Sequence, residues 1–297
     1  MKKLYHKIAE LIKAAKTRQM TIAQLMLEQE CTYSKETKET VLSRIKQQLE
    51  VMHKAANKGS SGNGVSSRTG LTGHQAAQLA AYRRQGKSLS GDTILTAMEN
   101  AVATNEVNAA MGVICAAPTA GSSGTLPGVL FALEKKLNLD VKAEIDFLLC
   151  ASGFGLIVAN NSSIAGATGG CQAEVGSASA MAAAGAVAVS GGSPQQSAQA
   201  FAFALSNLLG LVCDPVAGLV EIPCVSRNVV GAANALSAAD MALAGLVSKI
   251  PADEVILAMK DIGQRMPREL RETGLGGLAA TTTGNNIKVK IFGKDIQ

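Results

Sequence analysis

The chain has 297 residues, of which 47% are hydrophobic, only 3% are aromatic and 17% are charged. This low charge and high apolar content exclude intrinsic disorder. The 30 glycines and 7 prolines follow no short period, which excludes a collagen-like or linker protein. The length allows one large domain or two ordinary ones, with a sizeable core.

The net charge of +5 belongs to the start of the chain. Residues 1–58 hold 12 Lys and Arg against 6 Asp and Glu, whereas residues 59–297 hold 16 against 17. In the basic segment the two signs alternate on helical faces, without the interleaved aromatic residues typical of nucleic-acid binding. We therefore expect a solvated helical surface on which a partner chain docks, and no nucleic-acid partner.

The rest of the chain carries long uncharged stretches. Glu174 is the only charged residue between Asp146 and Asp214. Such lengths are compatible with a membrane span, but glycine pairs and Pro194 interrupt them and no Trp or Tyr flanks them. We expect tightly packed buried helices and no membrane. Because Glu10 interrupts the apolar stretch at the N-terminus, we also expect no secretory signal and a cytoplasmic location.

Helical periodicity runs along nearly the whole chain. Apolar residues recur at helical spacing over residues 4–15 and 41–52, and another helix is expected from Gly91 or Asp92 to about Ala116. Lys288–Phe292 is the best candidate for a short strand.

Two further helices have clear start signals. Ser193 before Pro194 is typical of an N-cap, and the helix it predicts extends to about Leu211. Pro251 begins another, with Asp253 and Glu254 at its positive end. These patterns predict an all-α fold, a compact multi-helix domain with Gly/Ser-rich loops.

Five Gly/Ser-rich segments are expected to be loops between these helices, and only the first is a plausible boundary. Residues 1–58 are predicted to form a charged N-terminal helical segment that packs on a body of residues 59–297, as one structural unit, because two helices alone bury too little surface. The predicted loops are Gly59–Gly73, Pro118–Gly128, Ala151–Gly155, Ser162–Gly170 and Gly274–Gly284.

The six cysteines fall into two groups. With no secretory signal expected, a metal or catalytic role is favoured over disulfides. Three lie beside Gly or Pro, at expected helix ends or turns: Cys171, Cys213 and Cys224. Of the others, Cys115 and Cys150 lie in apolar runs where ordinary core packing is expected, and Cys31 lies in a polar surface stretch.

The spacing of Cys171, Cys213 and Cys224 matches neither a zinc ribbon nor a ferredoxin, because no close cysteine pair occurs. From the residues alone, a three-thiolate metal site and three unrelated buried cysteines both remain open. Three thiolates on a cubic iron–sulfur cluster would leave one iron free to act as a Lewis acid.

Three segments carry a resemblance to a known family: Met111–Gly124, Gly170–Gly176 and Cys213–Asn228. They resemble the alpha chain of bacterial iron–sulfur-dependent L-serine dehydratase. The similarity extends from about Gly59 to Gly284 and is weaker over the N-terminal helices. The last block, CDPVAGLVEIPCVSRN, is long and unusual in composition, so a chance match is improbable.

The resemblance implies a [4Fe-4S] cluster held by Cys171, Cys213 and Cys224, with one open iron and no pyridoxal phosphate. It implies a lyase, an L-serine ammonia-lyase that eliminates water from L-serine to give pyruvate and ammonia. Residues 59–297 would then be the catalytic domain. The open iron would polarise the serine hydroxyl so that it can leave.

Candidate substrate-binding groups lie near these motifs. Successive amides around Ser122, Ser123 and Gly124 could form an anion nest for the substrate carboxylate, although a plain turn before the next helix fits the same residues. Arg227 is a candidate carboxylate clamp. The alternative is that Arg227 forms a structural pair with Glu174.

The general base is harder to place. His6 and His53 lie on charged helices where solvent exposure is expected, which leaves His74, although the family often has Gly-Asp where this chain has His74-Gln75. The motif S-S-S-H-T-x-G-P, found in the beta-type domain of single-chain relatives, is absent here. We therefore expect a separate beta chain to supply part of the active site.

A second departure from the family lies at the C-terminus. Some relatives end in a cysteine whose tail reaches the cluster, but this chain has no cysteine after Cys224. Asp295 or the terminal carboxylate could substitute for it, but a disordered tail is the usual expectation.

Three other functions remain compatible with the residues. The first is a related iron–sulfur L-cysteine desulfidase, which shares the cluster-bearing domain. The second is a non-catalytic subunit that binds a cluster, and the third is a helical scaffold with packed cysteines.

Overall fold

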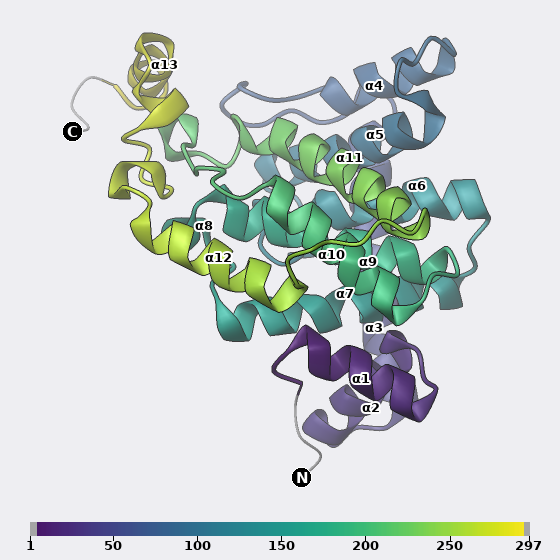
Figure 1. The fold of residues 1–297 in the computed structure, drawn as a ribbon. Coiled ribbons are helices and arrows are strands. Elements are labelled where there is room, and N and C mark those ends of the chain that lie inside the picture. Colours follow the sequence, from purple (N-terminus) through teal and green to yellow (C-terminus); the bar gives the residue numbers. More distant parts are fainter. Residues whose placement is uncertain (1–4, 294–297) are drawn as a thin grey trace.

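The computed structural model describes residues 5–293. Within them the chain is helical, with two isolated β-bridges and no strand, which confirms the all-α prediction. Most of the helices pack around one large core (Figure 1), and α4 packs on a smaller cluster beside it. The α-helices are α1 (Ile8–Arg18), α2 (Ile22–Ser34), α3 (Lys38–Ser60), α4 (Gln75–Arg84), α5 (Gly91–Ala109), α6 (Thr125–Leu137), α7 (Val141–Asn161), α8 (Gly166–Gly169), α9 (Ser177–Val189), α10 (Pro194–Asn207), α11 (Cys224–Leu243), α12 (Ala252–Arg265) and α13 (Thr282–Phe292).

Helix α9 forms the centre, packed against α6, α7, α10 and α11. It is built mainly from Ala, Ser, Gly and Val and is buried almost throughout its length. Small side chains let neighbouring backbones approach closely: a Cβ at Gly185 would lie 2.9 Å from the ring of Phe147, and one at Gly231 of α11 only 2.8 Å from Thr125 Oγ1. The uncharged stretches are therefore buried helices packed through small residues, as expected.

Helices α1 and α2 lie at one end of the molecule, next to α3 (Figure 1). Their apolar residues join the main core; Leu11 and Met26, for example, both lie against Gly153 of α7. In addition, the Asp253 carboxylate of α12 accepts hydrogen bonds from the amides of Ile8 (2.7 Å) and Ala9 (3.0 Å). Asp253 thus caps α1 as well as lying in the first turn of its own helix.

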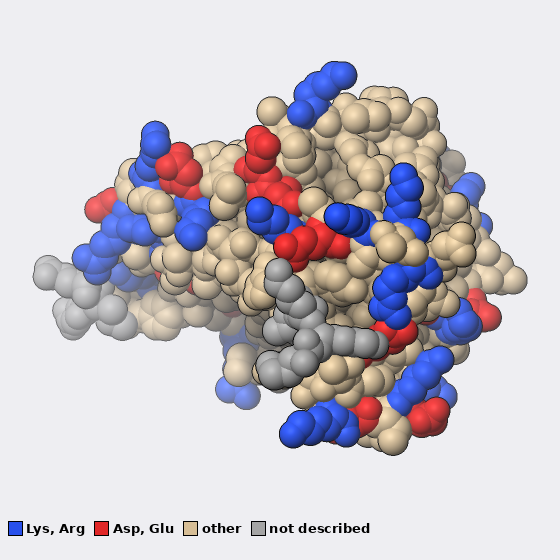
Figure 2. Space-filling model, turned by 60° about the horizontal axis from the view of Figure 1, so that its bottom comes forward, with Lys and Arg blue, Asp and Glu red and all other residues tan. Residues whose placement is uncertain are grey.

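The face that carries this end of the molecule shows Lys and Arg interspersed with Asp and Glu (Figure 2). This mixture agrees with the expected solvated helical surface. No helix within residues 5–293 has the length and apolar character needed to cross a membrane.

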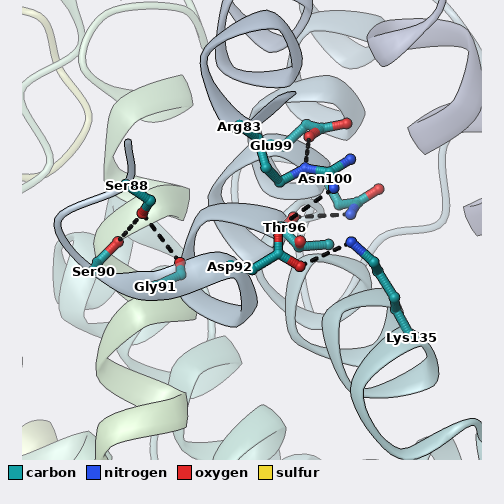
Figure 3. A network of polar contacts seen from close by, with 9 residues as sticks. All are labelled: Arg83, Ser88, Ser90, Gly91, Asp92, Thr96, Glu99, Asn100 and Lys135. Carbon is teal, nitrogen blue, oxygen red and sulfur yellow. Dashed lines mark hydrogen bonds and ion pairs between the residues drawn. The ribbon is translucent and has the colours of Figure 1, made fainter. Parts of the chain in front are cut away.

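A polar network joins α4, α5 and α6 on another side of the molecule (Figure 3). The Arg83 guanidinium contacts Glu99 at 2.7 Å and Asp92 at 3.6 Å, and Lys135 of α6 contacts Asp92 at 2.8 Å. Glu99 is only 6% exposed, so the Arg83 contact compensates a buried charge.

Several local predictions are confirmed. Ser193 accepts a hydrogen bond from the Gln196 amide (3.2 Å), and α10 begins at Pro194 as expected, although it ends at Asn207. Likewise α5 begins at Gly91, although it ends well before Ala116.

Two local predictions are wrong. Lys288–Phe292 belongs to α13, because the Thr281 hydroxyl caps that helix through the Gly284 amide (3.0 Å) and no partner strand is present in the described residues. Ala151–Gly155 is not a loop but the middle of α7, where its glycines face Met26 and Met181 of neighbouring helices.

Candidate metal centre

Cys171, Cys213 and Cys224 lie near enough to one another for their charges to interact. Cys171 precedes the π-helical turn Gln172–Gly176, Cys213 lies in the irregular segment after α10, and Cys224 begins α11. Cys171 and Cys213 are each 3% exposed and share a small buried cluster, and Cys224 is half-buried. The expectation of helix ends or turns is confirmed for Cys171 and Cys224, whereas Cys213 lies in an isolated β-bridge with Arg271.

Burial and mutual proximity perturb these three thiols. Burial raises the pKa of Cys171 to about 11 and that of Cys224 to about 12, and it raises the pKa of Cys213 far above its usual range. Cys171 adds to the increase in the pKa of Cys213 and of Cys224. The metal-free thiols therefore resist ionisation, and a cation placed among them would reverse this preference.

Local backbone conformation explains the position of Cys171. Gly170 has φ +76°, and a Cβ there would lie 2.7 Å from the Met266 side chain and 2.9 Å from the Leu211 carbonyl. The next residue, Gln172, donates its amide to the same Leu211 carbonyl (2.9 Å) and accepts from the Gly210 amide (2.8 Å). Two buried segments are thereby joined just before Cys213.

The C-terminal part of the chain holds Cys213 from the other side. Its amide donates to the Leu270 carbonyl (2.8 Å), and its carbonyl accepts from the Glu272 amide (2.7 Å). The next residue, Asp214, contacts Arg227 at 2.7 Å and accepts from the Leu278 amide at 2.8 Å. Asp214 therefore links three segments and does not simply cap a turn.

The Gly-rich loop Thr69–Gly73, with the sequence TGLTG, fixes the turn before Cys224. Glu221, which is 5% exposed, accepts hydrogen bonds from the hydroxyls of Thr69 (2.7 Å) and Thr72 (3.0 Å). The loop at the predicted domain boundary thus supports the third cysteine directly.

Two carboxylates complete the surroundings of Cys213. Ligand atoms of Glu174, Cys213 and Glu272 lie within 4.8 Å of one another. Gly166 faces this group: a Cβ there would lie 2.8 Å from Glu174 Oε2, 3.1 Å from Cys213 Sγ and 3.1 Å from Glu272 Oε2. A side chain here would crowd these atoms, so glycine lets the backbone lie directly against the acidic groups and the thiol.

Sequence reasoning missed Glu272. Its sequence signal is weak, a glutamate between Arg271 and a Gly-rich stretch, and its backbone has the left-handed value φ +62°. Only the pairing of its segment with Cys213 shows that it belongs to the site.

The predicted alternative of a Glu174–Arg227 pair is wrong. Glu174 accepts a hydrogen bond from the Thr119 hydroxyl (2.7 Å), and its burial raises the pKa of the carboxyl. Arg227 instead pairs with Asp214 and donates to the Val212 carbonyl (2.7 Å). Its charge also counteracts part of the increase in the pKa of Cys171.

The predicted anion nest lies against the carboxylates. Ser122 and Ser123 are fully buried, and their hydroxyls brace the loop, Ser122 on Thr119 (3.1 Å) and Ser123 on the Asn105 side chain (3.0 Å). The Gly124 amide donates to Asn228 Oδ1 (3.1 Å). The amides of residues 120–122 donate no hydrogen bond to residues 5–293. These preceding amides are therefore the donors available to an anion.

The histidines lie elsewhere. His74 is exposed at the start of α4, with Nδ1 2.6 Å from the Asn63 carbonyl oxygen, and no contact joins it to the cysteines. His6 is exposed as expected, but the same expectation for His53 is wrong, because its ring stacks on Phe131. Asp295 and the terminal carboxylate lie outside the described residues.

The remaining cysteines are separate from the centre. Cys150 is fully buried, with Sγ 3.6 Å from the Ala184 carbonyl oxygen, as core packing predicts. Cys31 and Cys115 are half-buried, and all six thiols are free.

Known proteins resemble this chain over most of its length. Residues 17–279 match the family model described as serine dehydratase alpha chain. The chain belongs to this family. It is 59% identical to a probable L-serine dehydratase, alpha chain, from Bacillus subtilis, over 98% of this chain and 96% of that protein. It is 44% identical to the L-serine dehydratase, alpha chain, of Peptoniphilus asaccharolyticus, over 94% and 95% of the two chains.

A longer relative also contains this unit. The L-serine dehydratase TdcG of Escherichia coli is 36% identical over 93% of this chain, but only 61% of its own length is covered. The family member described here thus corresponds to part of that longer protein.

Proposed function

We propose that this chain is the cluster-bearing alpha chain of an L-serine dehydratase, which converts L-serine to pyruvate and ammonia. The observation that carries the proposal is the proximity of two buried thiols, Cys171 and Cys213, and the half-buried thiol of Cys224, whose charges interact with one another. The names of the relatives support the choice of L-serine as substrate.

The donor set fits an iron–sulfur cluster. Thiolates are soft ligands that favour such clusters, zinc or copper(I), and the lack of a side chain at Gly166 lets the backbone lie close to Cys213 Sγ. Cys171, Cys213 and Cys224 would hold a [4Fe-4S] cluster with one iron lacking a protein ligand. When bound, it supplies a Lewis acid for the departing hydroxyl, with no need for pyridoxal phosphate.

The chain's own residues would bind and orient the substrate. The free amides of residues 120–122 suit the serine carboxylate. A Cβ at Gly121 would lie 3.3 Å from Glu174 Oε1, so this loop and the Glu174 carboxylate adjoin. Glu174 and Glu272 would accept hydrogen bonds from the substrate's ammonium or hydroxyl group.

Arg227 is better suited to positioning than to binding the substrate. Its side chain is 14% exposed, and its two terminal nitrogens are already engaged by Asp214 and the Val212 carbonyl. We therefore propose that Arg227 fixes the segment before Cys213 and keeps a positive charge near Cys171. This replaces the clamp role expected from the sequence.

A partner chain and a reducing compartment belong to the proposal. The alpha-chain names of the relatives imply a beta chain, and we propose that it contributes the base that removes the Cα proton, leaving His74 without that role. Six free thiols favour the cytoplasm.

The test is anaerobic reconstitution of the full chain with iron and sulfide, followed by assays with L-serine, L-threonine and L-cysteine, with and without the beta chain. We expect the reconstituted alpha chain to be brown. We expect pyruvate from L-serine only when both chains are present. Sulfide release from L-cysteine without serine turnover would contradict the proposed substrate. Full activity of the alpha chain alone would contradict the proposed role of its partner.

A further inference from the structure

A second group of potential metal ligands lies away from the cysteines, where α3, α6 and α7 meet. It consists of His53 of α3, Glu134 of α6 and Glu144 of α7. One ligand atom from each of the three residues lies within 4.8 Å of the other two. The group joins the charged N-terminal segment to the body of the molecule.

Glu144 has an unsatisfied oxygen in this group. The residue is 3% exposed, and its Oε1 is buried without a hydrogen-bond partner. His53 Nε2 lies 3.3 Å from this oxygen, outside hydrogen-bond geometry. A buried carboxylate oxygen left in this state is costly.

The 3.3 Å separation has a simple explanation in coordination chemistry. Two ligands of one tetrahedral ion, each about 2.0–2.1 Å from the metal, lie roughly 3.3 Å apart. The two atoms, which form an ion pair in this structure, therefore already have the separation of two ligands of one cation. Glu134 is half-buried, so its side chain has room to close onto the same ion.

The remaining features favour a cation here. The His53 ring stacks on Phe131, with centroids 4.1 Å apart, which fixes its orientation. Its side chain is 32% exposed, so water can reach the group and complete the coordination. Burial and the nearby Glu134 charge raise the pKa of Glu144, and His53 opposes this only in part.

We propose that His53, Glu134 and Glu144 bind one divalent transition-metal ion, of the class from Mn²⁺ to Zn²⁺. One imidazole and two carboxylates are the ligands that this class accepts, in contrast to the soft thiolates of the cysteine centre. The ion connects α3 with α6 and α7 and so fastens the N-terminal segment to the body. It takes no part in the proposed dehydration.

The test is a titration of the full chain with Mn²⁺, a metal that thiolates bind weakly. The electron paramagnetic resonance signal of free Mn²⁺ measures binding. We expect one Mn²⁺ per chain, displaced by Zn²⁺. Glu144→Gln and His53→Gln should each weaken binding at least about 10-fold. Glu50→Gln is the matched control, because it removes the same charge as Glu144→Gln at an exposed position of α3. It should change the affinity for Mn²⁺ by no more than about twofold.

Thermal unfolding separates a metal site from a simple ion pair. Excess Mn²⁺ should raise the Tm of the wild type and of Glu50→Gln but not that of Glu144→Gln. Should the Glu144 variant fail to fold, Glu134→Gln at the half-buried position provides the same comparison. Absence of Mn²⁺ binding at millimolar metal, or equal binding by the wild type and the ligand variants, would overturn the proposal.

Discussion

The uncharged centre and the charged N-terminal segment are built in different ways. Helices α9 and α11 pack through Ala, Gly and Ser, so that the backbone itself approaches its neighbours, and the cysteines lie at the turns that this packing fixes. Helices α1–α3 bury one apolar side and expose charges of both signs. The candidate metal centre thus lies where side chains are smallest, and we expect changes there to be the most damaging.

Removing a cysteine of the centre should have the largest effect. Cys213→Ser replaces the thiol that faces Glu174 and Glu272, and we expect reconstituted protein to lose its iron and at least about 100-fold of its L-serine turnover. Iron analysis and pyruvate formation measure this. Cys150→Ala, which lies in the main core and outside the candidate metal centre, should retain both. Loss of iron in that control would show that the effect is not specific to the cysteines of the centre.

Adding one methyl group to the tightly packed helices around α9 should be the next most damaging change. A Cβ at Gly231 would lie 2.8 Å from Thr125 Oγ1 and from Val175 Cγ1. We expect Gly231→Ala to lower the free energy of unfolding by about 1–3 kcal/mol, since overpacking outweighs the helix propensity of alanine. Denaturant unfolding checks this, with exposed Ser237→Ala on the same helix as control. A free energy of unfolding equal to that of the wild type would show that the helices around α9 pack less tightly than described.

At the junction of the two regions, Asp253→Ala should have a moderate effect. The change removes the acceptor for the amides of Ile8 and Ala9, and we expect a loss of about 1 kcal/mol in the free energy of unfolding. The neighbouring exposed Glu254→Ala serves as control. If both variants unfolded alike, the cap between α12 and α1 would contribute nothing.

The buried Glu106 should make stability depend on pH. Burial raises the pKa of this carboxyl, although it accepts hydrogen bonds from the Gln75 and Ala76 amides. The folded state therefore holds its proton to higher pH than the unfolded state does, and the stability from this group falls as pH rises from about 4.5 through the raised value. Denaturant unfolding across this range should show a smaller decline for Glu106→Gln than for the wild type. Parallel pH profiles would refute this.

At the exposed Asp92–Lys135 pair of Figure 3 the effect should be smallest. Asp92 and Lys135 are both more than half exposed, so Asp92→Asn should change the free energy of unfolding by at most about 0.5 kcal/mol, and less in high salt. A loss above about 1 kcal/mol, measured by denaturant unfolding, would show that this surface contributes as much as the junction at Asp253.

Features that depend on neighbouring residues could be predicted from the sequence. The cap at Ser193 follows from local chemistry, and so does the position of Cys171 beside Gly170. The all-α class follows from helical periodicity repeated along the chain.

Features that depend on distant segments could not. Glu272 reaches the centre only because its segment pairs with Cys213, and Arg227 meets Asp214 because α11 folds back on the preceding turn. The burial of His53 depends on Phe131 of another helix. No periodicity or spacing within one segment carries such information.

The most direct test of the central claim is the Mössbauer spectrum of the full chain reconstituted with ⁵⁷Fe and paired with its beta chain, with and without L-serine. We predict the signature of a [4Fe-4S] cluster in which about one quarter of the iron, the atom without a cysteine ligand, changes its spectrum when L-serine is added. A spectrum without cluster iron, or a cluster spectrum that L-serine leaves unchanged, would contradict the account.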